Sequence, residues 1–210
     1  DGPMIVLVGK LSASASEIVA AALKDYGRAL LVGSLSTHGK GSVQTVMPLN
    51  NWVRLPDSGK LKLTVSKFYR VAGGTTQKQG VTPDLILPTP YDYMEIGEAT
   101  LPNCLEADHT QKLAYRRLNR VLGHVETLVK HSNGRIKEDQ DFAYILEDIE
   151  TLKERLKDKS VSLSETKRLA EKDEEKAKRE KRKKERKSRG NAEEVVFDLT
   201  IKMSAAIRTG

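Results

Sequence analysis

The chain has 210 residues, of which 31% are charged and 5% are aromatic, and its formal charge at pH 7 is +7. This length allows a buried core, and the single Cys104 excludes an intramolecular disulfide and a zinc site built from cysteines. No run of 18 apolar residues occurs, so no segment is predicted to span a membrane. Between residues 164 and 190 there are 13 basic and 7 acidic residues, so almost all of the net charge comes from this segment.

The first ninety residues have the pattern of an α/β fold. Short apolar runs predict buried strands at 3–8 and 28–33, and the alanine-rich run between them predicts a helix over 14–26. A strand–helix–strand order implies a parallel crossover connection. Further strands are predicted at 42–49, at 60–71, where alternating residues indicate half burial, and at 80–88. The opening DGPMIVLVGK has the character of a strand rather than of a signal peptide, so the sequence is expected to be a fragment.

The second half of the chain has helical periodicity. One apolar stripe over 113–128 predicts a helix that starts near Thr110 and ends at HSNG, residues 131–134. A stripe over 142–156 predicts a second helix, and the capping-box spacing of SLSE, residues 162–165, predicts a charged third helix that reaches about Lys187. The last apolar segment, 192–207, fits either a short closing helix or a strand.

The strongest chemical signal is a serine cluster, SASASE, at the start of the first predicted helix (residues 12–17). Ser14 and Glu17 have the spacing of a capping box, and this spacing alone indicates only an ordinary helix start. A serine between a buried strand and a helix also places its hydroxyl near the first-turn N–H groups, of which Ala15 N–H is the candidate donor to an oxyanion. A serine hydroxyl needs a neighbouring base to become a nucleophile.

Lys40, between Gly39 and Gly41 in THGKGS, is the candidate base. The loop lacks the spacing of a phosphate-binding loop, so a nucleotide site is set aside. An amine accepts a proton only when it is uncharged, a form that burial among apolar groups favours, and the flanking glycines let the backbone pack closely. Gln44, four residues later, is placed to orient the amine. His38 is a competing base, and a solvated loop lysine is the ordinary alternative.

Three stretches carry a family resemblance: SASASEIVAAALKDYGRALLVG with THGKGSVQT, SKFYRVAGGTTQKQGVTPDLILP, and YMEIGEA. Over residues 3–98 the chain resembles the tail-specific proteases of the carboxyl-terminal processing peptidase family. The resemblance implies a crotonase- or ClpP-like α/β scaffold, with Ser14 as nucleophile, Lys40 as general base and Gln44 holding the lysine. Asp25 matches an acidic position of the family, although a solvated carboxylate near a helix end is an equal alternative. Glu17 either supports the site or closes the cap.

The resemblance also implies a domain organisation and a setting. Residues 1–90 would be the C-terminal part of a serine–lysine protease domain, 91–109 a linker, and 110–210 a helical domain with a basic helix at about 164–189. Protein substrates with apolar C-termini, a bacterial periplasmic location and no cofactor or metal are expected. The sequence departs from the family pattern in two ways. In the first, the loop before Lys40 is one residue longer than usual and has His38 in place of an aromatic residue. The family's PDZ domain and its Gly-rich oxyanion strand are absent from this sequence.

The alternative to a protease is a non-catalytic fragment or a binding module. Residues 176–189 contain ten basic and two acidic residues, which suits contact with the phosphates of nucleic acid. The segment has no interleaved aromatic residues for base stacking, and charge-dense helices are more often solvated faces. Nucleic-acid binding is therefore disfavoured. A third possibility is that the helical region docks an adaptor protein.

Overall fold

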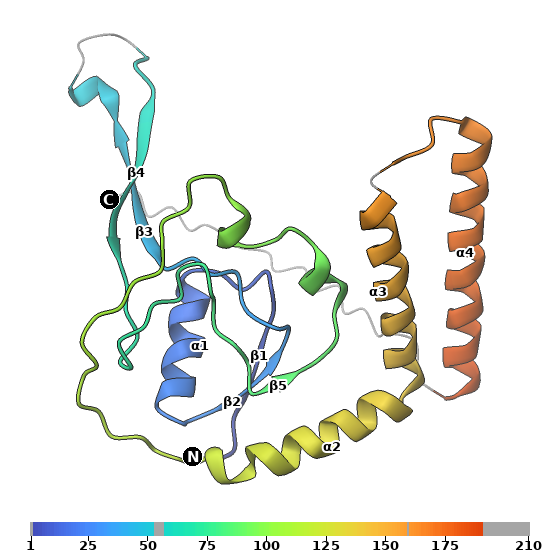
Figure 1. Ribbon diagram of the computed structural model, residues 1–210, viewed down its shortest axis with the longest axis horizontal. Helices are drawn as coiled ribbons and strands as arrows, with labels where there is room; N and C mark the ends of the chain where they lie inside the picture. Colours follow the sequence, from blue (N-terminus) through green and yellow to red (C-terminus); the bar gives the residue numbers. More distant parts are fainter. Residues whose placement is uncertain (1, 53–56, 159, 191–210) are drawn as a thin grey trace, which may run out of the picture. The chain divides into compact units, whose positions relative to one another are not determined.

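The computed structural model describes residues 2–52, 57–158 and 160–190 (Figure 1). The segment 192–207, with its predicted helix or strand, lies outside the described residues. Contacts divide the chain into two compact units, residues 1–158 and 159–210, and each is described by itself. The predicted boundaries at residues 90 and 109 stay a prediction.

The core of the first unit is a three-stranded parallel sheet. Its strands are β1 (Ile5–Val8), β2 (Leu30–Gly33) and β5 (Leu85–Ile86), in the order β1-β2-β5. Helix α1 (Ala15–Asp25) connects the first two strands, so the predicted parallel crossover is confirmed. The strand predicted at 80–88 shortens to two residues, because Pro83 and Pro88 have no N–H group to donate to a ladder.

Helices cover both faces of this sheet (Figure 1). On one face Ala20 and Ala21 of α1 pack with Leu31 in a buried cluster, and their small side chains let the helix lie close to the strands. On the other face Leu30, Val32 and Leu85 are buried against the residues that open helix α2 (Val125–Glu138), among them Val125, Leu128 and Val129. The sheet therefore holds the N-terminus of α1 on a rigid support.

Strands β3 (Ser42–Pro48) and β4 (Lys60–Lys67) form a separate antiparallel hairpin with an irregularity between Val43 and Gln44. Both strands were expected, and the structure confirms them. The expected half burial of β4 is wrong, since Leu61 and Val65 are 45% and 56% exposed. In a two-stranded sheet each strand has a single partner, so its apolar side chains are covered little by neighbouring strands (Figure 1).

The helix predicted to start near Thr110 is wrong in its bounds. Residues 107–120 are irregular, and their backbone is bonded to distant segments instead: Thr110 N–H to Gly73 O, and Leu118 N–H to Tyr26 O. Helix α2 starts only at Val125 and continues through the HSNG sequence to Glu138. The apolar stripe is present in the sequence, but backbone N–H groups in its N-terminal half form hydrogen bonds to distant segments instead of helical ones.

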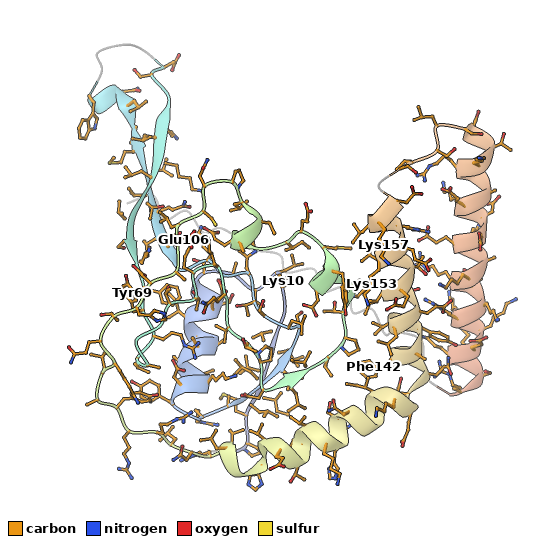
Figure 2. All side chains as sticks on the ribbon, viewed as in Figure 1. Lys10, Tyr69, Glu106, Phe142, Lys153 and Lys157 are labelled. Carbon is orange, nitrogen blue, oxygen red and sulfur yellow. The ribbon has the colours of Figure 1, made fainter. Side chains whose placement is uncertain are left out.

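The other helices follow the predicted pattern. Helix α3 (Gln140–Asp158) belongs to the first unit and buries Tyr144 and Ile149, and Lys153 Nζ lies 4.4 Å from the ring centre of Tyr93 (Figure 2). Helix α4 (Glu165–Ser188) lies in the second unit and starts after Ser164, rather than after Ser162 as the capping-box spacing suggested. Within the described ranges there are also four single turns of 3₁₀ helix, at Leu49–Asn51, Pro90–Tyr93, Glu98–Thr100 and Leu122–His124. Among the described residues, no helix is long and apolar enough to cross a membrane.

Candidate active site

Ser14 stands at the turn between β1 and α1 in a strained backbone conformation. It is the N-cap residue of α1, with φ 57° and ψ −115°. Residues other than glycine rarely adopt a positive φ, and such strain, on the order of 1–3 kcal/mol, tends to gather at functional sites. The side chain of Ser14 is half-buried, and Ala15, whose N–H is the predicted oxyanion donor, is exposed. The backbone geometry thus marks this serine independently of its spacing to Glu17.

Glu17 is the organising residue of the site. Its side chain is completely buried, and its carboxylate accepts four hydrogen bonds. Oε2 accepts from the backbone N–H groups of Ser14 and Lys40, at 2.7 and 2.9 Å. Oε1 accepts from the Thr37 hydroxyl and from Gly39 N–H, at 2.5 and 2.7 Å. One carboxylate oxygen therefore joins the backbone of the predicted nucleophile to the backbone of the predicted base.

The environment of Glu17 explains how a carboxylate is tolerated inside the protein. Its four donors are uncharged, and hydrogen bonds from N–H and O–H groups to an ionised acceptor are stronger than those between neutral groups. The carboxylate also lies in the first turn of α1, where the helix dipole favours negative charge. Glu17 closes the cap through Ser14 N–H and also binds the backbone of the lysine loop through Lys40 N–H. Its support of a catalytic site stays a prediction.

The glycines beside Lys40 are required by close packing. A Cβ atom on Gly39 would lie 2.8 Å from Lys78 O, and φ at Gly39 is +94°. A Cβ atom on Gly41 would lie 2.6 Å from Thr75 Oγ1. Real Cβ atoms do not come this close, so the loop can pack here only with glycine on both sides of the lysine. The expected close approach of the backbone is confirmed.

The predicted catalytic side chains differ in how far they are exposed to solvent. Lys40 is half-buried, whereas Gln44 is exposed at the irregular position in β3. Among the residues that the structure describes, no hydrogen bond joins the Ser14 hydroxyl, the Lys40 amine and the Gln44 amide. His38, the competing base, has a carboxylate nearby that the sequence did not suggest: its Nε2 lies 4.0 Å from Glu98 Oε2.

Asp25 lies at the opposite end of α1 from Ser14. It is buried, and its two oxygens accept from Nε and a terminal nitrogen of Arg70 at 2.9 and 2.5 Å. This hydrogen-bonded pairing raises the pKa of the Arg70 guanidinium, although burial opposes the effect. A further guanidinium, that of Arg117, donates to the backbone oxygen of Asp25 at 3.1 Å. The alternative of a solvated carboxylate is wrong, because Asp25 fixes the chain that leaves the hairpin against the end of α1.

Two buried residues of this region were missed in the sequence. Thr37 is 1% exposed, and its hydroxyl donates to Glu17 and accepts from Val81 N–H at 2.7 Å. Gln77 is fully buried and contacts the lysine loop through Gly41 N–H. Both lie within the stretches that carried the family resemblance, yet nothing in their local spacing indicates burial. Among the residues with described positions, no group of three or more His, Cys, Asp and Glu side chains could hold a metal ion.

Helix α4 carries the basic segment of the sequence. It has no buried residue, and its last turn contains Arg186 and Lys187. The helix itself was predicted, and the structure confirms it. A role in binding stays a prediction, since a charged helix of this kind is also an ordinary solvated face.

Comparison with known proteins supports one family along the whole chain. The family model for peptidase family S41 matches residues 1–87, and the model for the C-terminal domain of tail-specific protease matches residues 91–206. A tail-specific protease of Haemophilus influenzae is 38% identical over 183 residues, which cover 85% of this chain and 26% of that protein. A carboxy-terminal-processing protease of Bartonella bacilliformis is 44% identical over 107 residues, 48% of this chain and 23% of that protein.

A solved structure, the photosystem II D1 C-terminal processing protease, is 40% identical, covers 43% of this chain and 22% of its own, and has a TM-score of 0.35. The chain spans about a quarter of the length of the curated relatives named above. The α/β part followed by helices agrees with the two family matches in the order in which they occur. This chain belongs to the tail-specific proteases of peptidase family S41.

Proposed function

We propose that the full-length protein is a serine endopeptidase in which Ser14 is the nucleophile and Lys40 the general base. The observation that carries this proposal is the buried Glu17 carboxylate, which binds the backbone N–H groups of both residues through one oxygen. A carboxylate buried without a cation among its hydrogen-bond donors is costly to keep. A reaction between Ser14 and Lys40 explains why a costly buried carboxylate holds the serine and the lysine loop together, because the two residues must keep a fixed position relative to each other.

The reaction would proceed through an acyl-enzyme. Uncharged Lys40 takes the proton from the Ser14 hydroxyl as the serine oxygen attacks the peptide carbonyl, and Ala15 N–H donates to the oxyanion that forms. The protonated amine then gives its proton to the leaving peptide nitrogen. Water, deprotonated by the same amine, attacks the ester and regenerates the serine. Gln44 would orient the amine as substrate is bound.

The substrate class and the setting are part of the proposal. The names of the relatives indicate proteases that act on protein C-termini. We infer that this protein hydrolyses proteins recognised by apolar C-terminal residues. The scaffold proposed is crotonase- or ClpP-like, and the place of action is the bacterial periplasm. Among the described residues, β3 and β4 pair only with each other, so the hairpin has a strand edge along which an extended peptide could pair.

The test replaces Ser14 and Lys40 separately by alanine in the full-length protein, with cleavage of an unfolded protein substrate as the assay. Ser16→Ala is the matched control for the serine, because Ser16 is exposed and its hydroxyl donates only to Ala13 O. Lys130→Ala, on the exposed side of α2 and away from the hairpin, is the control for the lysine. We expect both site variants to lose turnover by at least about 10³-fold while the controls keep it.

A third variant separates the two candidate bases. His38→Gln should retain most of the activity if Lys40 takes the proton. Full loss in His38→Gln together with retained activity in Lys40→Ala would transfer the role to the histidine. Retained proteolysis in Ser14→Ala would end the assignment of the nucleophile.

A further inference from the structure

The lysine loop is held on a second side by Gln77, a residue with no part in the proposed reaction. Its side chain is fully buried, and its amide bonds to the lysine loop and to two positions of the segment 97–105. Oε1 accepts from Gly41 N–H at 3.0 Å. Nε2 donates to Glu98 Oε1 at 3.3 Å and to Leu105 O at 3.0 Å. Both amide protons therefore have partners, and the acceptor end points at the residue that follows Lys40.

Glu98 reaches the same loop from the other direction. Its backbone N–H donates to His38 O at 2.9 Å, and its carboxylate lies between Gln77 and the His38 ring. The approach is close, because a Cβ atom on Gly97 would lie 2.9 Å from His38 O, and φ at Gly97 is +130°. A glycine is needed for this contact. The loop is thus bound, at the residue two positions before Lys40, to the segment that follows residue 96.

Further contacts keep this segment in place. Glu106 forms an ion pair with Lys78, and Tyr69 and Lys67 both bond to Asp108, at 3.1 and 3.2 Å (Figure 2). The 98–108 segment is therefore anchored to the loop after Gln77 and to the end of the hairpin. These outer contacts are solvent-exposed, whereas the Gln77 amide is buried. The inner contact is the one that can transmit position to Lys40.

We propose that Gln77 and Glu98 are positioning residues for Lys40, and that residues 97–105, which fall within the match to the C-terminal domain, complete the active site. The inference rests on the proposed function of Lys40. Glu17 fixes Thr37, Gly39 and Lys40 on one side, and the Gln77–Glu98 pair fixes His38 and Gly41 on the other. Because contacts hold the loop backbone on both sides of Lys40, Glu17 and the Gln77–Glu98 pair together determine the position of the amine.

The expected consequence is a loss in turnover rather than in substrate binding. A misplacement of about 1 Å at a reacting group can lower the rate by about 10²-fold. Gln77→Leu removes the acceptor for Gly41 N–H and both donors, so kcat should fall by about 10²-fold while KM changes by less than about threefold. Glu98→Ala leaves Leu105 O as a partner of the amide, so the loss should be smaller, about tenfold.

Two further variants separate positioning from a general structural effect. Glu98→Gln keeps an acceptor oxygen for Gln77 Nε2, so it should restore kcat to within about threefold of the unsubstituted protein. Glu106→Ala is the matched control, because it breaks a contact of the same segment at the surface and should leave kcat unchanged. All four variants are made in the full-length protein, and circular dichroism and thermal unfolding report folding.

The outcomes decide the question in each case. A folded Gln77→Leu protein with kcat within about threefold of normal overturns the inference, as does a Glu98→Gln protein no better than Glu98→Ala. If Gln77→Leu does not fold, the comparison of Glu98→Ala with Glu98→Gln decides alone. Failure of the proposed function is distinguishable, since it would appear as retained proteolysis in Ser14→Ala and Lys40→Ala. Loss in those two with normal turnover in the Gln77 and Glu98 variants would refute only the positioning role.

Discussion

Replacement of Glu17 tests how far one buried carboxylate holds the site together. Glu17→Ala leaves the N–H groups of Ser14, Gly39 and Lys40 and the Thr37 hydroxyl without their acceptor. A hydrogen bond to a charged group contributes about 1.5–3 kcal/mol. Gly39 and Thr37 are buried and cannot turn to water, whereas Ser14 and Lys40 are half-buried and can. Two lost contacts in full give an expected destabilisation of about 3–6 kcal/mol.

Glu17→Gln is the sharper variant because it has nearly the same shape. The amide keeps one acceptor oxygen, but its NH₂ group faces two donors in either orientation. No cavity forms, so the remaining loss, about 2–4 kcal/mol, reports the mismatch of donors alone. The free energy of unfolding is measured by urea titration of the full-length protein, and proteolysis is measured in parallel. Turnover should fall in Glu17→Ala, since the backbone of Lys40 is released from that of Ser14, and in Glu17→Gln, since its NH₂ group opposes either that pair of donors or the Thr37 and Gly39 donors.

The control for this experiment is an exposed glutamate in the first turn of another helix. Glu126 stands in the first turn of α2 and is exposed, so Glu126→Gln should change the free energy of unfolding by less than about 0.5 kcal/mol. The reasoning would be refuted by a Glu17→Gln protein that unfolds within that same range and turns over substrate normally. Such a result would reduce Glu17 to an ordinary capping residue.

Three other predictions address separate parts of the structure. Asp25→Asn should cost about 3–5 kcal/mol in urea unfolding, because it leaves a largely buried guanidinium without its counter-charge; a change below 1 kcal/mol would contradict the structural role. Gly41→Ala should cost about 1–3 kcal/mol and lower turnover through overpacking, whereas Gly134→Ala, in open space within α2, should stabilise by about 0.5–1 kcal/mol. The hydrogen bond from Lys67 lowers the pKa of the Asp108 carboxyl, so its stabilising effect is present above the ordinary value near 4 and is lost as the pH falls through the lower folded value. An NMR titration should show that low midpoint, and Lys67→Met should raise it.

Much of the fold could be predicted because its signals are local. The apolar runs of β1 and β2 and the alanine-rich run of α1 each predict their element from a few consecutive residues. The same is true of the apolar stripe of α3 and of the charged α4. The pair Ser14 and Lys40 was predicted from the residues themselves and from a family resemblance in contiguous sequence. Both family matches agree with the resemblance, and the roles of the two residues stay a prediction.

The errors arose where partners lie far away along the chain. Residues 107–120 carry an apolar pattern of helical period, but their N–H groups bond to Gly73 and Tyr26, and these bonds compete with a helix. Asp25 looked like a solvated carboxylate because its partner, Arg70, is 45 residues away. Tertiary contacts of this kind leave no periodic trace.

By itself, the sequence determined most of the secondary elements, the serine at the N-terminus of a helix and the lysine between two glycines, since these depend on residues nearby in the chain. Only the tertiary structure decided what surrounds that lysine. Glu17, Gln77 and Glu98 come from three regions of the chain, and each is polar, so composition alone would place them at the surface. Glu98 is half-buried and accepts from the Gln77 amide. Glu17 and Gln77 are buried because backbone N–H groups of a glycine-flanked loop need acceptors inside the protein, and that need exists only once the chain has folded.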